Sequence, residues 1–137
     1  SWDGKQATVD SVALDDDHDL AVLHTVEPLA SWGELGVGRE GETVWVIGYP
    51  RGGQLHVTRG SIITAVDGDS LSGEDSRTEV GEVWQVSAKV VTGNSGGPLI
   101  GADGSVVGVV YGYGAESENG YAIQSSSVKN ALDEKGW

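Results

Sequence analysis

One serine stands in a glycine-rich segment that suits a nucleophile. Residues 92–99 read TGNSGGPL, so Ser95 follows Gly93 and Asn94 and precedes two further glycines. A nucleophilic hydroxyl must stand clear of its own backbone, and the preceding glycine lets a backbone N–H turn toward a developing oxyanion. The later glycines leave room for a substrate. The segment therefore predicts a reactive serine beside an oxyanion hole, and the alternative is a plain glycine-rich turn.

The elements that would position this serine are short and apolar. Six apolar runs follow Glu42, at 44–48, 54–66, 83–91, 97–100, 105–111 and 120–124. Asp103 and Gly104 between two of these runs predict a hairpin, because such a turn needs a positive φ, which glycine adopts freely. Six short strands at this spacing predict an all-β barrel or sandwich.

The two ends of the chain have different patterns. Residues 6–14 and 20–26 predict two more strands, and the polar turn between them contains Asp15, Asp16, Asp17 and His18. Val128, Ala131 and Leu132 have helical spacing, which predicts a short C-terminal helix over 125–135 with a serine as its N-cap.

Composition excludes several classes of protein. The 137 residues predict one domain, and 22 glycines argue against a helical bundle, because a glycine costs about 1 kcal/mol in a helix interior. The formal net charge of −13 disfavours nucleic acid and anionic membranes as partners, since both need a basic face. No apolar run reaches the roughly 18 residues of a membrane span. A domain whose acidic surface binds a cationic partner stays open as an alternative.

Metal sites and cofactors are not expected. The absence of cysteine excludes disulfides and thiolate zinc sites. Asp67, Gly68, Asp69 and Ser70 are similar to the start of a calcium loop, but Leu71 falls where an oxygen ligand belongs. We therefore predict no metal and no cofactor.

Several motifs together resemble one family. The run GNSGGPL, the strands LIGADGSVVGVVYGYG and the later NGYAI resemble the active-site region of trypsin-like (chymotrypsin-fold) serine proteases, and most closely the compact bacterial HtrA/Deg branch. Upstream, DHDLAVLHT resembles the segment with the triad aspartate, and VIGYPRGG resembles the G-x-P-x-G loop of the family. These matches keep the family order from about residue 6 to residue 132.

The resemblance implies a particular architecture. The expected fold is a trypsin-like double β-barrel in a single domain over 1–137. The second barrel is complete at 42–124, the first barrel is truncated to a remnant at 1–30, and the short helix at 125–135 closes the chain. Ser95 follows Asp19 by 76 positions (95 − 19), a separation that fits compact bacterial members of the family.

The resemblance also assigns roles to residues. Ser95 is the expected nucleophile, and Asp19 is the residue that orients the general base. Asp15, Asp16 and Asp17 are rivals, but Asp19 directly precedes the Leu-Ala-Val-Leu strand. Gly93, Asn94 and Ser95 form the expected oxyanion hole. The expected substrate-binding residues are Lys89, Val90, Thr92, Val110, Tyr111, Gly112, Tyr113 and Gly120.

Lys89 has a special place in this set. It lies six positions before the nucleophile, which in the family is the base of the primary specificity pocket. If Lys89 points inward, an acidic substrate residue gains a charge-assisted hydrogen bond. If it points outward, Ala88 or Val90 shapes the pocket, and small apolar side chains are preferred, as is usual for HtrA-like pockets.

The family histidine has no counterpart in the sequence. In the family it precedes the aspartate, yet only 18 residues precede Asp19, and His18, His24 and His56 all read as ordinary surface or strand residues. We therefore predict a serine endopeptidase domain that is inactive by itself, with a peptide or protein as substrate and with a complementary N-terminal segment or a second copy as partner. The alternative is a non-catalytic peptide-binding relative. The family favours a secreted, periplasmic or cell-surface location.

Overall fold

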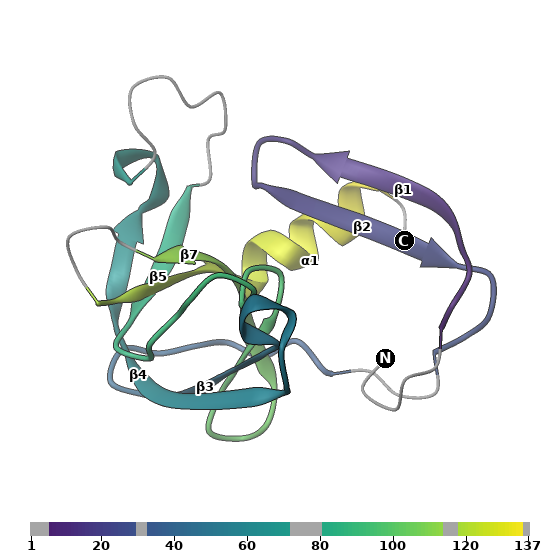
Figure 1. Ribbon diagram of the computed structural model, residues 1–137. Coiled ribbons are helices and arrows are strands. Elements are labelled where there is room, and N and C mark those ends of the chain that lie inside the picture. The colour runs from purple at the N-terminus through teal and green to yellow at the C-terminus, as the bar shows by residue number, and fades with distance from the viewer. Residues whose placement is uncertain (1–5, 30–32, 72–80, 114–117, 136–137) are drawn as a thin grey trace.

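The computed structural model describes residues 6–29, 33–71, 81–113 and 118–135 (Figure 1). Six strands form a closed barrel in the order β3-β4-β5-β8-β7-β6, and β1 and β2 form a separate antiparallel sheet. The elements are β1 (Val9–Asp15), β2 (Leu20–Thr25), β3 (Thr43–Gly48), η1 (Pro50–Gly52), β4 (His56–Asp67), η2 (Gly68–Ser70), β5 (Glu82–Val86), β6 (Pro98–Ile100), β7 (Val106–Tyr113), β8 (Gly120–Gln124) and α1 (Ser125–Glu134).

The barrel core consists of small and β-branched side chains. Successive side chains of a strand point to opposite faces, so in β3 Val44 and Val46 are wholly buried while Trp45 between them is only partly so. Leu99, Val107 and Ile123 from β6, β7 and β8 are also fully buried. Each of the six apolar runs contains a strand, which confirms the all-β barrel.

One of the predicted strands is shorter than its apolar run. β5 ends at Val86, whereas the run continues to residue 91. Ser87 N donates to Ser61 O, and Ala88 packs so closely on Gly60 that a Cβ at Gly60 would lie 2.2 Å from Ala88 N. Residues 87–91 therefore leave the strand ladder and lead directly into the segment around Ser95.

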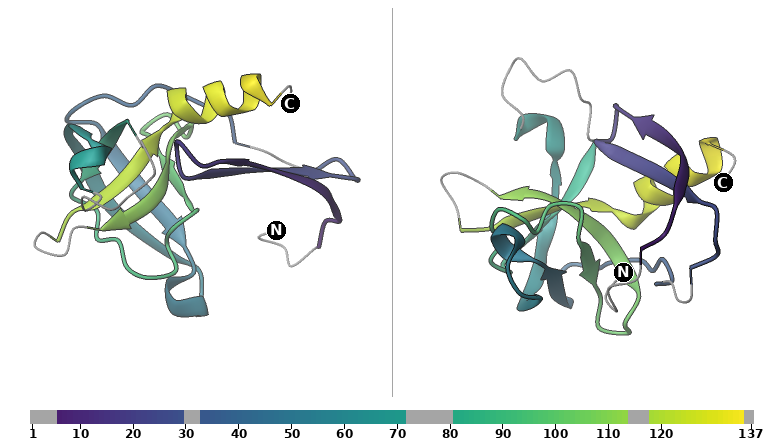
Figure 2. Two further views of the ribbon diagram at one scale, coloured as in Figure 1. Left: turned by 90° about the horizontal axis from the view of Figure 1, so that it is seen from above. Right: turned by 45° about the vertical axis from the view of Figure 1, so that its right-hand side comes forward.

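The β1–β2 hairpin has one covered face and one open face. Leu20 packs in a cluster with Tyr111, Tyr121 and Val128, which attaches the hairpin to the barrel and to α1. Figure 2 shows the hairpin beside α1. Val12 pairs with Leu23, and both side chains are 56% exposed on the opposite face. Within the described residues, this apolar face has no cover.

The helix joins the barrel to the hairpin. It contacts β7, β8 and β2, and Ala131 is buried in this contact. It begins at Ser125 as expected, but the predicted serine N-cap is wrong, because the N-cap residue is Gln124 and no side chain caps the helix. The Ser125 hydroxyl donates instead to the carbonyl of Gly36. No helix in the described parts of the chain is long and apolar enough to cross a membrane.

Candidate active site

The glycine-rich turn, residues 91–97, is braced from within by Asn94. Its side chain is buried, and its Oδ1 accepts a hydrogen bond from Val91 N at 3.1 Å. Asn94 N donates to Val91 O at 3.0 Å, and Gly97 N donates to Asn94 O at 2.9 Å. The Asn94 N–H is therefore already engaged, and Asn94 holds the shape of the turn.

Two contacts attach this turn to β7 and to the loop before β4. Gly96 N donates to Val110 O at 2.7 Å, and Arg51 N donates to Thr92 O at 2.9 Å. Gly93 has a φ of 97°, and a Cβ there would lie 2.6 Å from Arg51 N. Glycine is required at this position, because both the backbone conformation and the close approach exclude a side chain.

Ser95 is exposed at the tip of the turn. Its Oγ lies 3.5 Å from the carbonyl oxygen of Tyr111, at the limit of a hydrogen bond. Among the described residues, the N–H groups of Gly93 and Ser95 have no hydrogen-bond acceptor. Two unoccupied backbone donors therefore flank Asn94 beside an exposed hydroxyl, and an oxyanion hole requires backbone donors of this kind.

The backbone of β7 leaves an open edge beside this serine. The register of β7 against β8 shifts between Val110 and Gly112, so Tyr111 is the extra residue of a bulge. Along β7 the pairing with β6 ends at Val109, so the residues after Val110 have a strand on one side only. Bulges often redirect a residue next to an active site, and here the bulge turns the Tyr111 carbonyl toward Ser95.

Asp19 lies near the same tyrosine. It is exposed in the turn between β1 and β2, with a φ of 52°, a left-handed conformation that aspartate adopts more readily than most residues. Burial raises the pKa of Tyr111 to about 12, and the charges of Tyr121 and Asp19 contribute smaller increases. The charge of Asp19 therefore acts on the Tyr111 side chain, while the backbone carbonyl of Tyr111 contacts Ser95.

The rival aspartates have other surroundings. Asp15 is buried and accepts hydrogen bonds from the backbone N and the ring Nδ1 of His18, the latter at 3.0 and 3.1 Å. Asp16 and Asp17 are exposed in the turn. Asp15 therefore closes the turn that presents Asp19.

Comparisons with known proteins agree with this site. The family described as trypsin-like peptidase domain matches residues 1–109. This chain belongs to that family. The serine protease Do-like HtrA of Bacillus subtilis is 38% identical over 97% of the chain, and a probable periplasmic serine endoprotease, DegP-like, of Chlamydia muridarum is 34% identical over 96%.

The structural relatives lead to the same family. The crystal structure of the active form of the Rv3671c protease from Mycobacterium tuberculosis has a TM-score of 0.79 and 32% identity, over 93% of this chain and 57% of that one. The chain spans 31% of the Bacillus subtilis relative and 27% of the Chlamydia muridarum relative. These matches confirm the trypsin-like fold and the HtrA resemblance.

None of the three histidines of this trypsin-like domain bonds to Ser95 within the described residues. The Nδ1 of His18 contacts Asp15, and the Nδ1 of His24 lies 2.7 Å from Asp10 Oδ1. The pKa of the exposed Asp10 carboxyl is lowered by this contact with His24. His56 lies at the start of β4 and lines a separate pocket with Asn94.

The expected specificity residues fall on two sides of one segment. Val90 is buried, and a Cβ at Gly120 would lie 2.3 Å from its Cγ2, so these two residues face each other. Lys89 is exposed and, with Val91, lines the separate pocket. Thr92 is exposed and offers its carbonyl to Arg51. The side chain of Tyr113 lies outside the described residues.

One residue at the site was missed by sequence reasoning. Arg51 holds the Thr92 carbonyl from a strained conformation with a φ of 54°. Its segment, Tyr-Pro-Arg-Gly-Gly, was matched to the G-x-P-x-G loop of the family, but its contact with Thr92 was not foreseen, because a contact across 41 positions leaves no local signal.

Proposed function

We propose that this chain carries the nucleophile and the orienting aspartate of a serine endopeptidase that hydrolyses peptide bonds. Ser95 Oγ attacks the scissile carbonyl, and the N–H groups of Gly93 and Ser95 bind the oxyanion. Asp19 orients a histidine that acts as general base. The observation that carries this proposal is the exposed Ser95 Oγ beside two unoccupied N–H donors and the Tyr111 carbonyl.

The open edge of β7 supports a peptide as the substrate. An extended chain that adds to an exposed strand edge binds through its main chain, and alternate side chains enter pockets. The backbone after Val110 offers such an edge next to Ser95. The residue before the scissile bond then faces Val90 and Gly120, and their apolar surface suits a small apolar side chain.

The general base belongs to a complementary segment in this proposal. His18 and His24 are each engaged by an aspartate of the hairpin, and His56 lies with Arg51 and Lys89 in another pocket. The uncovered apolar face at Val12 and Leu23 would be buried by further strands of a first barrel. We therefore expect the chain alone to have almost no activity.

Labelling with a fluorophosphonate tests the proposal. A complementary segment with the family histidine, added in trans or fused before residue 1, should restore peptide cleavage and labelling, and Ser95→Ala should abolish both. Loss of a triad member reduces kcat by several orders of magnitude, so the difference is easily measured. Efficient cleavage by the chain alone, abolished by Ser95→Ala, would show that one of its own histidines serves.

A peptide-binding role without catalysis is the second candidate. It is favoured because His18 and His24 are each held by an aspartate and so provide no base for Ser95. The open edge of β7 could still bind a peptide without such a base. Peptide binding without labelling of Ser95 in the complemented protein would support this role and contradict the first. For either role we propose a location outside the cytoplasm, because the Chlamydia muridarum relative is described as a periplasmic serine endoprotease.

A further inference from the structure

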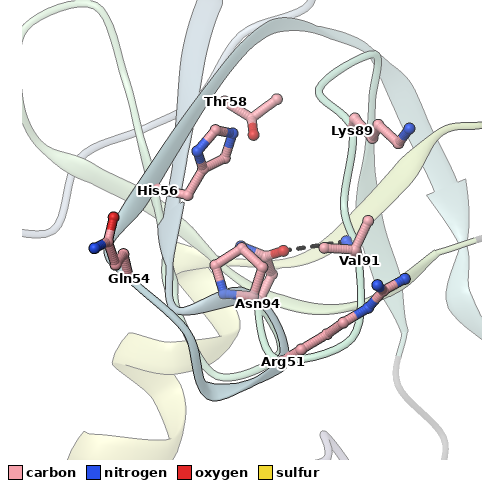
Figure 3. Close-up of a pocket in the computed structure, with 8 residues that line it drawn as sticks. Arg51, Gln54, His56, Thr58, Lys89, Val91 and Asn94 are labelled. Atoms are coloured by element: carbon pink, nitrogen blue, oxygen red, sulfur yellow. Dashed lines mark hydrogen bonds between the residues drawn. The ribbon is translucent and has the colours of Figure 1, made fainter.

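A second pocket lies behind the glycine-rich turn. Its volume is about 540 Å³, and Figure 3 shows it between the start of β4 and the segment that leads to Ser95. Because Lys89 and Val91 line it while Val90 is buried against Gly120, it lies on the opposite side of that segment from the proposed specificity wall. We call it the cationic pocket; its polar lining consists of Arg51, Gln54, His56, Thr58, Lys89 and Asn94.

The charge of this pocket is opposite to that of the chain. The sequence has 21 acidic residues and a formal net charge of −13, yet no described acidic residue lines the pocket. Two of the eight lysines and arginines, Arg51 and Lys89, line it together with one of the three histidines, His56. Within the described residues, none of these three side chains has an ion-pair or hydrogen-bond partner, although the other two histidines do.

The pocket is mechanically connected to the oxyanion turn. Asn94, which holds the shape of the turn, forms part of its wall, and Val91 is both a lining residue and the hydrogen-bond partner of Asn94. Arg51 binds Thr92 O through its own N–H and has one of the two positive φ values among described non-glycine residues. Strain of this kind persists where the surrounding structure enforces it, commonly at functional sites.

We propose that the cationic pocket binds an acidic peptide segment and that binding braces the glycine-rich turn. Arg51 and Lys89 lie on either side of Val91, with His56 across from them, so two carboxylates of one segment can each reach a cation (Figure 3). Gln54 and Thr58 add neutral hydrogen-bonding groups on the far wall. A single small anion would leave most of the 540 Å³ empty. Pockets of this size hold larger ligands, and a short peptide segment has such a size.

Binding of hexaglutamate tests the first half of this proposal and does not depend on the proposed function. We expect the peptide to bind the intact chain, and we expect Lys89→Gln and Arg51→Gln each to weaken it about fivefold or more at fixed salt, because each removes a charge-assisted contact. Lys129→Gln is the matched control: Lys129 is an exposed lysine on α1, paired with Asp133 at 2.6 Å, and its loss should leave the affinity unchanged.

Three outcomes would overturn the site. These are no binding of hexaglutamate at millimolar concentration, equal loss of affinity in the Lys129 and Lys89 variants, and displacement of the peptide by an equal concentration of inorganic phosphate. The last outcome would mean that a small anion suffices. Hexalysine, measured in parallel, should not bind.

The second half of the proposal is that peptide binding braces the glycine-rich turn. Amide hydrogen exchange at Val91, Asn94 and Gly97, whose N–H groups donate the hydrogen bonds within the turn, should slow when hexaglutamate binds, and this slowing should be absent in Lys89→Gln. Unchanged exchange despite peptide binding would overturn the bracing. Faster labelling of Ser95 in the complemented protein is the further effect that rests on the proposed function, so its failure alone, with exchange slowed, would count against that function and not against the pocket.

Discussion

The contact between Val90 and Gly120 can be tested by a pair of substitutions. A Cβ at Gly120 would lie 2.3 Å from Val90 Cγ2, far inside van der Waals contact, so Gly120→Ala must displace the valine. Extra methylenes in a packed core cost about 1–3 kcal/mol. Gly120 has no positive φ, so alanine meets no backbone strain there, and the cost reports the clash.

The reverse substitution creates space at the same place. Val90 is buried, and Val90→Ala removes two methyl groups worth about 0.8 kcal/mol each, plus a term for the cavity, so we expect a loss of about 2 kcal/mol. In the double variant the methyl group added by Gly120→Ala enters the space that the valine leaves. The cost of the double variant should therefore fall short of the two single costs together by at least about 1 kcal/mol.

Urea unfolding followed by circular dichroism measures these free energies without any need for activity. Gly112→Ala is the matched control, because a Cβ there meets no atom within 4 Å and its φ is not positive. Its free energy of unfolding should stay the same or rise by up to about 1 kcal/mol. Strict additivity of Gly120→Ala and Val90→Ala would refute the reasoning, because it would mean that the two residues do not face each other.

Three further predictions concern the same region. Asn94→Ala should lower the free energy of unfolding by about 1–3 kcal/mol, since it leaves the Val91 N–H without its acceptor, and thermal unfolding would show this as a lower Tm. Gly97→Ala should lower the free energy of unfolding more than Gly112→Ala does, because a Cβ at Gly97 would lie 2.5 Å from Ile47 O. Equal urea midpoints for the two variants would contradict this. An ultraviolet titration should show one tyrosine that ionises near pH 12 and is lost in Tyr111→Phe. Because the folded-state pKa of Tyr111 is raised from 10.0 to about 12, its contribution to stability is complete below pH 10 and is lost as the pH rises toward 12.

The strands and the reactive turn were predictable because their signals are local. Alternation of buried valines in β3 follows from the pleat of a strand, which any apolar run of this kind must obey. Gly93 and Gly96 have positive φ values, a conformation that glycine adopts freely, so the glycine-rich segment TGNSGGPL suits the observed turn. Together with the family motifs, these signals were sufficient for the fold class, and the comparisons confirm it.

The placement of Ser95 and Asp19 near each other depends on the tertiary structure. Ser95 and Asp19 lie 76 positions apart (95 − 19), and nothing local in the sequence brings them together. Their common neighbour, Tyr111, is defined by a bulge in β7 and by the packing of Leu20 on the barrel. Both features depend on the register between strands, which local propensity does not determine.

Three details were decided only by tertiary structure. The end of β5 at Val86 depends on the close packing of Ala88 on Gly60, and the role of the Ser125 hydroxyl depends on its hydrogen bond to the carbonyl of Gly36. The side of the chain on which Lys89 lies is the third, since it is decided by which neighbour enters the core, and Val90 does. In each case the deciding contact joins residues far apart in the sequence. Apolar patterning therefore determines which segments form strands, while long-range packing determines where each one ends and which side chains it presents to the site.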